Sequence, residues 1–279
     1  MKQYPAIPRA ADAPDRLFEQ GHLWVLEKID GAILRFQLQA AGFLRFGDGT
    51  TVYDAPEAVP TPYRPAVRHV REQLDRDALR AAVDDVEQVV FFGESTHAHR
   101  ISYDWDRLPP FLGFDVRDGE EFLTPGAAQR VFEQLGLRPV NAVERELPAR
   151  DFDPDSYTVP DSNWYDGPAE GVVVRNKRGD RATLQHPEFR DRQETVTVDA
   201  TAEELATRYA TRHRLQTLAR DLETREEPVI VDTLHQRALE ALAREHHREL
   251  FCAADPVDRS AFRSAVAARV REFLTERYD

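Results

Sequence analysis

The chain has 279 residues and an acidic composition, with 50 Asp and Glu against 37 Lys and Arg and a net charge of −13. With 41% hydrophobic residues, a chain of this length predicts one large domain or two unequal ones with a sizeable core. The sequence contains no long apolar run and no charged-then-apolar leader, so we expect a cytoplasmic protein without a membrane span. The single cysteine, Cys252, excludes an internal disulfide, a zinc ribbon and dithiol redox chemistry.

The cations are almost all arginine, because the chain holds only three lysines, Lys2, Lys28 and Lys177. Together with the acidic excess, this bias resembles the composition of proteins from salt-loving archaea, which favours a halophilic origin. The Debye length falls to about 3 Å at 1 M salt, so self-repulsion of a charged surface costs little there. Each retained lysine is therefore a candidate for a chemical role, with a solvated surface charge as the alternative.

Short apolar strands alternate with a few helices over the first two hundred residues. Turn residues at 47–49 and 177–180 predict hairpins. Apolar residues at helical spacing predict helices around 67–74 and from Thr124 to Gly136. Segment 148–168, rich in Pro, Asp and Ser, predicts a long surface loop. The predicted strands lie at 23–26, 32–38, 42–46, 89–92, 111–116, 171–175 and 182–184.

The pattern becomes helical after about residue 200. Thr201 and Glu204 form a capping-box pattern, followed by apolar residues that predict one helix through Leu222. A second predicted helix carries Leu234, Ala238 and Leu242, and a third begins near Asp258. We therefore expect an α+β domain with mostly antiparallel sheets over residues 1–198 and a small all-helical domain over residues 199–279.

Lys28 lies between two predicted strands, in the sequence Lys-Ile-Asp-Gly of residues 28–31. A lysine at such a position can be partly desolvated at the mouth of a sheet, where its amine is more easily made neutral and nucleophilic. Gly31 lets a ligand approach the backbone closely. Taken alone, the tetrapeptide is more typical of a surface hairpin turn.

Further motifs follow Lys28 in a characteristic order, and the segment Tyr4–Pro8 precedes it. The series resembles the covalent nucleotidyltransferases, the superfamily of ATP-dependent ligases and capping enzymes. It is most similar to the RNA ligases of the second phage type and their editing-ligase relatives, over nearly the whole chain. The motifs are Phe-Phe-Gly-Glu at 91–94, Phe-Leu-Gly-Phe-Asp-Val at 111–116, Glu-Gly-Val-Val-Val-Arg at 170–175 and His-Pro-Glu-Phe at 186–189.

The resemblance implies an ATP-dependent RNA ligase with a nucleotidyltransferase (adenylation) domain. Lys28 matches the nucleophile that becomes lysyl-AMP with Mg²⁺ or Mn²⁺ as cofactor. The AMP then passes to an RNA 5′-phosphate, which is joined to a 3′-hydroxyl, a reaction used in RNA repair. Glu94 matches the ribose ligand, Phe114 the ring that stacks on adenine, and Glu170 the carboxylate near the lysine and the metal. The remaining expected nucleotide-binding residues are Glu27, Asp30, Gly31, Arg45, Arg175 and Arg181.

The sequence also departs from the family pattern. The last motif of the family normally has two lysines, and Thr183 and Gln185 stand at those positions. Arg181 shares their strand face and is able to hold a phosphate, but a guanidinium does not relay protons. Arg45 falls several residues before the arginine that the family has near Asp48.

These departures leave a second hypothesis open, a catalytically weakened nucleotide- or RNA-end-binding module of the same fold. A third hypothesis is a ligase or transferase with another acceptor, such as DNA or a GTP-using capping reaction. It is less favoured because those enzymes usually append an oligonucleotide-binding barrel, whereas the last eighty residues of this chain predict helices. The sequence does not predict the oligomeric state.

An acidic chain is a poor general binder of nucleic acid, so RNA contacts must be local. Arg208 and Arg212 are the candidate RNA contacts, and ion pairing with acidic neighbours is the alternative. His97 and His99 follow Glu94 closely and raise the question of a metal, although two loop histidines are more often hydrogen-bonding or surface residues. His246 and His247 are adjacent on a predicted helix and point apart, which makes shared ligation of a metal improbable. Cys252 is most simply a small buried side chain.

Overall fold

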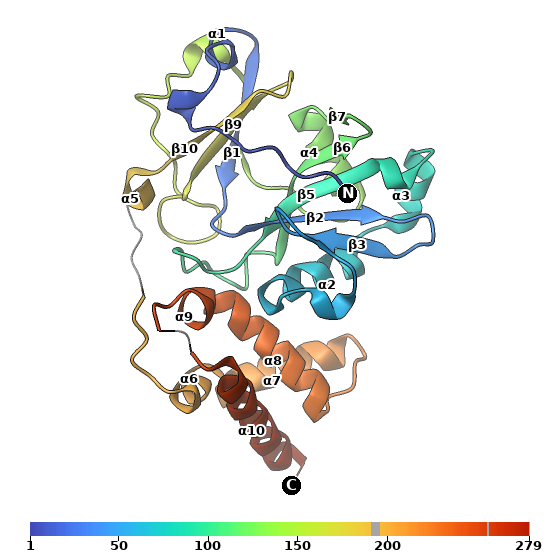
Figure 1. The fold of residues 1–279 in the computed structure, drawn as a ribbon, viewed down its shortest axis with the longest axis vertical. Coiled ribbons are helices and arrows are strands. Elements are labelled where there is room, and N and C mark those ends of the chain that lie inside the picture. The colour runs from blue at the N-terminus through green and yellow to red at the C-terminus, as the bar shows by residue number, and fades with distance from the viewer. Residues whose placement is uncertain (191–195, 256, 279) are drawn as a thin grey trace. The chain divides into compact units, whose positions relative to one another are not determined.

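The computed structural model describes residues 1–190, 196–255 and 257–278, which form two compact units (Figure 1). The sheet unit contains residues 1–96 and 101–190, and the helical unit contains the short segment 97–100 together with the described C-terminal residues from 196. The expected boundary between residues 198 and 199 stays a prediction. Within the described ranges, no helix is both long and apolar enough to cross a membrane.

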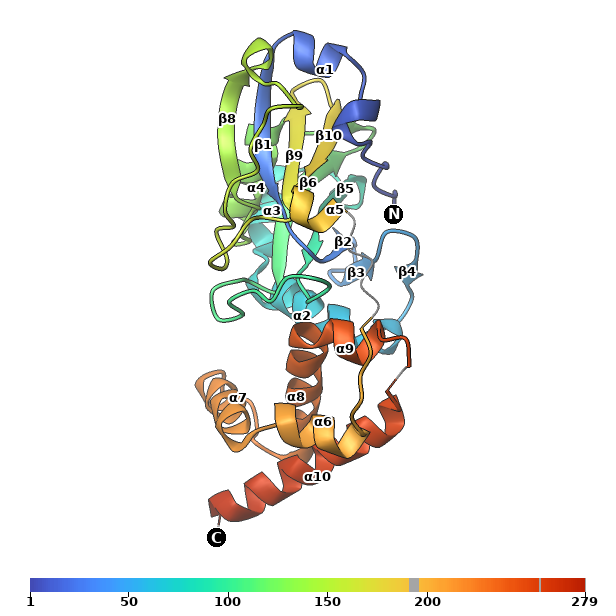
Figure 2. The same ribbon diagram turned by 90° about the vertical axis from the view of Figure 1, so that its left-hand side faces the viewer.

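The sheet unit is built from two antiparallel sheets, as the α+β prediction requires. The strand order is β10-β9-β1-β8 in the four-stranded sheet, whose strands lie side by side in Figure 2, and β4-β3-β2-β5-β6-β7 in the six-stranded sheet. The strands of the first sheet are β1 (His22–Lys28), β8 (Ala142–Pro148), β9 (Gly171–Asn176) and β10 (Arg181–Gln185). Those of the second are β2 (Ala32–Leu38), β3 (Leu44–Gly47), β4 (Val52–Tyr53), β5 (Val89–Ser95), β6 (Phe111–Asp118) and β7 (Glu121–Phe122).

Helices cover one face of the six-stranded sheet and bury its main core. The core side chains come from alternate residues of β2 and β5, including Leu34, Phe36 and Phe91, and pack against Val67 and Phe132 of the covering helices. These helices are α2 (Arg64–Gln73), α3 (Arg76–Ala82) and α4 (Pro125–Gln134). The short helices of the unit are α1 (Arg16–Glu19), α5 (Pro187–Arg190), and the 3₁₀ turns η1 (Ala10–Asp12), η2 (Pro56–Ala58), η3 (Thr61–Tyr63), η4 (Val86–Gln88) and η5 (Ala149–Asp151).

The chain crosses from one sheet to the other at Lys28. Strand β1 ends at this residue in the four-stranded sheet, and β2 begins at Ala32 in the six-stranded sheet. In the first sheet Lys28 pairs with Gly171, which in turn pairs with Gln185. The end of β1 therefore places Lys28 beside the last motif, at the edge where the two sheets diverge.

All seven predicted strands of the sheet unit and both of its predicted helices are confirmed, with β3 starting at Leu44 rather than at residue 42. Strand β8 escapes prediction because its sequence, Ala-Val-Glu-Arg-Glu-Leu-Pro, lies at a sheet edge and lacks apolar alternation. The prediction of a surface loop for 148–168 is wrong in part. Phe152, Val159 and Trp164 of this segment are buried and contribute to the unit's cores.

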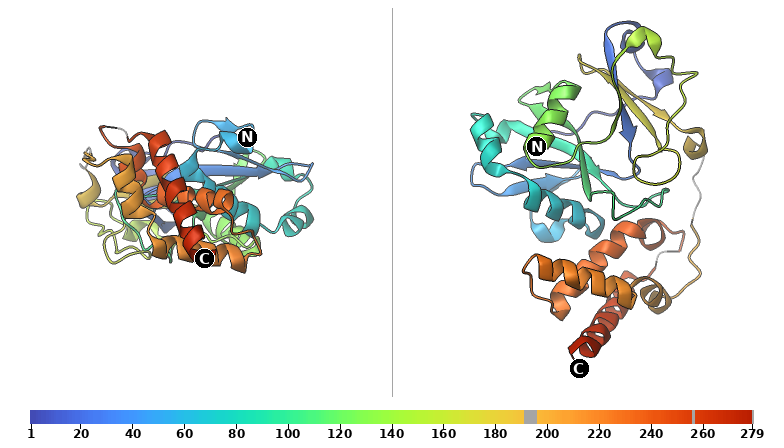
Figure 3. Two further views of the ribbon diagram at one scale, coloured as in Figure 1. Left: turned by 90° about the horizontal axis from the view of Figure 1, so that it is seen from below. Right: turned by 180° about the vertical axis from the view of Figure 1, so that it is seen from behind.

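The described residues of the helical unit form five helices with their own core, coloured orange to red in Figure 3. The single helix predicted through Leu222 is wrong, because the chain leaves the helical conformation at Ala210 and Thr211 caps a new helix by accepting from the backbone N–H of Arg214. The capping box of Thr201 and Glu204 and the other two predicted helices are confirmed. The helices are α6 (Ala202–Tyr209), α7 (Arg212–Thr224), α8 (Val231–Glu245), α9 (His247–Phe251) and α10 (Arg259–Tyr278).

Candidate nucleotide-binding site

A cavity of about 350 Å³ lies in the sheet unit where the two sheets diverge. This volume falls within the range of small-molecule sites. Its wall combines apolar side chains with a few ionisable groups, which is the usual composition of a ligand pocket. The residues that line it are Tyr4 to Ile7, Leu26 to Ile29, Ile33, Glu94, Phe114, Val140, Val173, Arg175 and Thr183.

Lys28 forms an ion pair with Glu170 at this cavity. Its Nζ lies 2.5 Å from Oε2 of Glu170, and the exposed fraction is 32% for the lysine side chain but only 2% for the carboxylate. Gln185 donates a hydrogen bond from Nε2 to the other carboxylate oxygen of Glu170 at 3.4 Å. The amine is thus reachable from the cavity while the nearest base is held behind it.

Glu94 lies on the neighbouring strand β5 and also lines the cavity. Burial raises the pKa of its carboxyl group to about 8, the negative charges of Glu170 and Asp30 add to the rise, and the Lys28 ammonium opposes it. Gly31 makes this placement possible. A Cβ at Gly31 would lie 2.6 Å from the carbonyl oxygen of Ser95 and 2.9 Å from Cγ of Glu94.

Glu27 belongs to the cavity wall, and its carboxylate is buried against the loop that precedes β9. Its carboxylate accepts a hydrogen bond from Oγ of Ser162 at 2.6 Å and others from the backbone N–H of Asn163 and the side chain of Asn141. Burial raises the pKa of Glu27, and these donors oppose the rise. The contacts hold the end of β1 in place beside Lys28.

Asp30 is also buried, on the other side of Lys28. Its carboxylate accepts from the backbone N–H of Ile101 at 2.8 Å, and its own N–H donates to the Tyr103 hydroxyl at 2.9 Å. Sequence reasoning missed Tyr103 and Ser162. They lie in irregular segments far from Lys28 along the chain, and no motif marks a residue that only supplies a hydrogen bond to a neighbour.

Phe114 forms an aromatic wall of the cavity together with Tyr4. The two ring centroids lie 5.0 Å apart with the planes at 74°, an edge-to-face contact. The Tyr4 hydroxyl donates to Asp115 at 2.9 Å, which fixes the N-terminal segment against β6. This segment also runs along β10, because Thr183 donates both its N–H and its hydroxyl to the carbonyl of Pro8.

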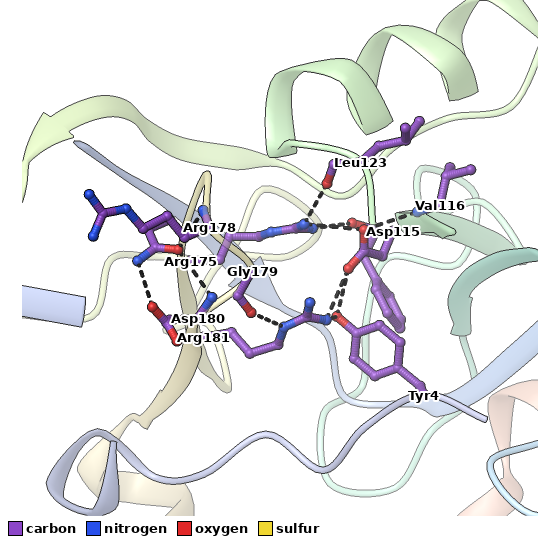
Figure 4. A network of polar contacts seen from close by, with 11 residues as sticks. Tyr4, Asp115, Val116, Leu123, Arg175, Arg178, Gly179, Asp180 and Arg181 are labelled. Carbon is purple, nitrogen blue, oxygen red and sulfur yellow. Dashed lines mark hydrogen bonds and ion pairs between the residues drawn. The ribbon is translucent and has the colours of Figure 1, made fainter. Parts of the chain in front are cut away.

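The two buried arginines of the site converge on Asp115, as Figure 4 shows. Nη2 of Arg175 lies 3.1 Å from one carboxylate oxygen, and Nη1 of Arg181 lies 3.0 Å from the other. Arg175 also donates to the backbone carbonyls of Phe114 and Leu123. Arg181, which was expected to contact a phosphate, is not among the residues that line the cavity. In this structure both side chains brace the strand that carries Phe114.

The remaining expected site residues lie apart from this cavity. Arg45 is 40% exposed on β3, its guanidinium lies 3.8 Å from Asp54, and it does not line the cavity. In the helical unit, Arg212 forms an ion pair with Glu276 at 2.7 Å. Arg208 lies over the ring of Tyr209 at 6.0 Å. The RNA contacts expected of Arg208 and Arg212 stay predictions.

The carboxylates of Glu94 and Glu170 are the oxygen donors of the cavity region that fit a divalent metal. Mg²⁺ and Mn²⁺ prefer carboxylates, waters and substrate phosphates over nitrogen or sulfur ligands. Asp30 faces the backbone of Ile101 and is committed to that contact. A metal bound with a nucleotide would therefore be held by one or both glutamates.

The model of the RNA ligase family matches residues 21–190, which is more than half of the chain. The chain belongs to the RNA ligase family. The matched region of the chain includes the cavity wall from Leu26 to Thr183 and all of the motifs described above. A search of curated proteins finds no significant match.

Solved structures with similar folds include RNA ligases. An archaeal ATP-dependent RNA ligase is 16% identical with a TM-score of 0.50, covering 99% of this chain and 66% of that chain. The Naegleria gruberi RNA ligase with pyrophosphate is 15% identical with a TM-score of 0.51, covering 70% of this chain and 58% of that chain. At these identities the similarity shows the nucleotidyltransferase fold. The present chain spans about two thirds of the length of the archaeal ligase.

Proposed function

We propose that the chain is an ATP-dependent RNA ligase that forms a lysyl-AMP intermediate on Lys28. The observation that carries this proposal is the ion pair of Lys28 with the buried Glu170, at a cavity also lined by Glu94 and Phe114. Membership of the RNA ligase family supports the same reaction class.

The first step needs a neutral amine, because an ammonium group has no lone pair. Glu170 lies within hydrogen-bond distance of Nζ and is placed to accept its proton. Nζ of Lys28 then attacks the α-phosphorus of ATP, the nitrogen–phosphorus bond forms, and the bond to the bridging oxygen breaks. Pyrophosphate carries away the electron pair, and AMP remains on the lysine as a phosphoramidate.

The cavity walls suit the remainder of the nucleotide. Phe114 offers an aromatic face for adenine, and Glu94 offers a carboxyl group for hydrogen bonds to the ribose. A Naegleria gruberi RNA ligase structure holds ATP and manganese. In this chain Glu170 would hold such a metal, which neutralises phosphate charge when bound.

The later steps transfer AMP from Lys28 to an RNA 5′-phosphate and join that end to a 3′-hydroxyl, with release of AMP. Positioning of the two RNA ends then supplies much of the rate. Arg208 and Arg212 of the helical unit are the proposed RNA contacts, and each would have to exchange its present neighbour for a phosphate.

Transfer of label from α-labelled ATP to the protein tests the first step. The wild type should acquire an acid-labile label with Mg²⁺ or Mn²⁺, and Lys28→Ala and Lys28→Arg should acquire none. Lys177→Ala is the matched control, because Lys177 is exposed and forms an ion pair with Glu146. No label on the wild type over a range of salt concentrations would refute the proposal.

A second function is favoured by one observation, the absence of the two family lysines near Glu170. Thr183 and Gln185 occupy those positions and are engaged with Pro8 and Glu170. A weakened module of the same fold would bind ATP or 5′-phosphorylated RNA in a calorimetric titration without acquiring label. Competition of labelled ATP with unlabelled GTP distinguishes the active ligase and the weakened binding module from a GTP-using transferase.

A further inference from the structure

Three histidines meet in the helical unit, although His247 is far from His97 and His99 in the sequence. His97 and His99 belong to the segment 97–100, and His247 begins α9. One ring nitrogen from each lies within 4.8 Å of the other two, and the ring centroids are 4.3 to 4.7 Å apart. His97 and His247 are buried. The proposed ligase reaction uses none of these rings.

The backbone holds the segment 97–100 against α8 and α9. The N–H of Ala98 donates to the carbonyl of Arg244 at 2.8 Å, and the ring of His247 donates to the carbonyl of Ala98. A histidine that binds a metal through one nitrogen usually donates the other N–H to a carbonyl or carboxylate. The hydrogen bond to Ala98 is of this kind, so the ring of His247 is already oriented as a ligand would be.

Cys252 directly follows α9 and adjoins His247, outside the group of three histidines. Its Sγ lies 3.6 Å from Nδ1 of His247. A tetrahedral zinc ion, with bonds of about 2.0 Å to nitrogen and 2.3 Å to sulfur, places such a pair of ligand atoms about 3.6 Å apart. Cys252 is exposed, so the prediction of a small buried side chain is wrong and the thiol is accessible to a metal from solvent.

The three histidines are spaced only slightly wider than the ligands of a zinc ion, since one ring nitrogen of each lies within 4.8 Å of the other two. Nitrogens bound to one tetrahedral zinc lie about 3.4 Å apart, so closing the three rings around an ion requires movements on the order of 1 Å.

We propose that His97, His99 and His247 bind a zinc ion in the helical unit, and that Cys252 moves in beside His247 as the fourth ligand. Imidazole and thiolate donors favour zinc over magnesium or manganese, which prefer oxygen. Binding would convert the thiol to a thiolate and release its proton to solvent. Four protein ligands close the coordination sphere, so the ion would fasten the segment 97–100 to α9 rather than catalyse a reaction. This proposal does not depend on the ligase activity.

Zinc titration of the full chain tests the site directly. The protein is treated with a chelator, dialysed, and titrated with zinc chloride in competition with a chromogenic chelator. We expect one zinc ion per chain and a rise in the thermal unfolding midpoint. Cobalt(II) should give the intense visible bands of a tetrahedral site together with a thiolate charge-transfer band. Failure to bind zinc, or preference for magnesium or manganese, would overturn the proposal.

Variants at accessible positions assign the ligands without a large risk to folding. His99→Gln should weaken zinc affinity by more than the roughly 10- to 100-fold that loss of an outer partner costs. Cys252→Ser should abolish the thiolate band while the histidines retain weaker binding. His213→Gln on α7 is the matched control, because His213 is exposed and outside the cluster. Equal affinity in the wild type and His99→Gln, with unchanged circular dichroism, would contradict the assignment.

Discussion

The side-chain amide of Gln185 donates to the carboxylate of Glu170, on the oxygen opposite the one that binds Lys28. Gln185 also donates to the backbone carbonyl of Phe189 in the last motif. A neutral amide thus holds the Glu170 carboxylate, at a position where the family pattern has a lysine. The exchange removes one positive charge from the end of β10.

Restoring the cation should increase the rate of the first step. We expect Gln185→Lys to raise the rate of Lys28 labelling by about tenfold, because an ammonium group there would stabilise charge that develops on the phosphates. The measurement is single-turnover transfer of label from ATP. Gln185→Met, which has similar length but no donor, is the control. A loss of rate as large in Gln185→Lys as in Gln185→Met would show that the amide itself is required.

Gly31 should tolerate no side chain. In Gly31→Ala the new Cβ must displace the Ser95 carbonyl or the Glu94 side chain, because both lie within 3 Å of it. Such overpacking costs about 1–3 kcal/mol of stability, and the shifted Glu94 should weaken ATP binding. Urea unfolding and nucleotide titration measure the two effects. Gly49→Ala is the control, since among the described residues other than its chain neighbours no atom lies within 4 Å of a Cβ at that glycine. Equal effects of the two substitutions would refute the steric account.

Asp115 should be the most sensitive carboxylate of the sheet unit. Asp115→Asn leaves the buried guanidinium groups of Arg175 and Arg181 without their counter-charge. Removing one partner of a buried ion pair costs about 3–5 kcal/mol, which urea unfolding would detect. Glu120→Gln is the control, because Glu120 also pairs with two cations but is 77% exposed, where ion pairs contribute little. Similar losses in both variants would contradict a special role for burial.

Stability should depend on pH through Glu94. Its pKa is about 8 in the folded protein and near the ordinary value of 4.5 in the unfolded chain. Between these values the folded state binds more protons, so the free energy of unfolding falls as the pH rises from about 4.5 to 8. Below pH 4.5 Glu94 is protonated in both the folded and the unfolded state, so the cost of burying its negative charge is absent.

Removing the titrating group should flatten this dependence. Between pH 5 and pH 9 we expect the wild type to lose more stability than Glu94→Gln, as measured by urea unfolding at both pH values. Glu120→Gln should keep the wild-type profile, because ion pairing with Lys2 and Arg117 lowers the pKa of Glu120 and places its titration below this window. If the free energy of unfolding depended on pH in the same way in the wild type and in Glu94→Gln, Glu94 would be excluded as the source of the pH dependence.

Local pattern predicted most of the secondary structure and the order of the motifs. Strands such as β1 and β5 have strong apolar runs, and helices such as α4 begin and end at proline and glycine signals. The local pattern failed to predict elements whose conformation depends on tertiary contacts. Strand β8 is charged and is defined by its pairing with β1, and the break at Ala210 depends on which residue caps the next helix.

The sequence by itself determined the α+β class, the family resemblance and the choice of Lys28, because these depend on residue types in a fixed order along the chain. Only the tertiary structure decided what each charged side chain contacts. It paired Lys28 with Glu170, turned Arg175 and Arg181 toward Asp115, and brought His97 and His99 to His247. The physical reason is that an ion pair or ligand cluster depends on distances of a few ångströms between residues about 60 to 150 positions apart, which no local sequence pattern encodes.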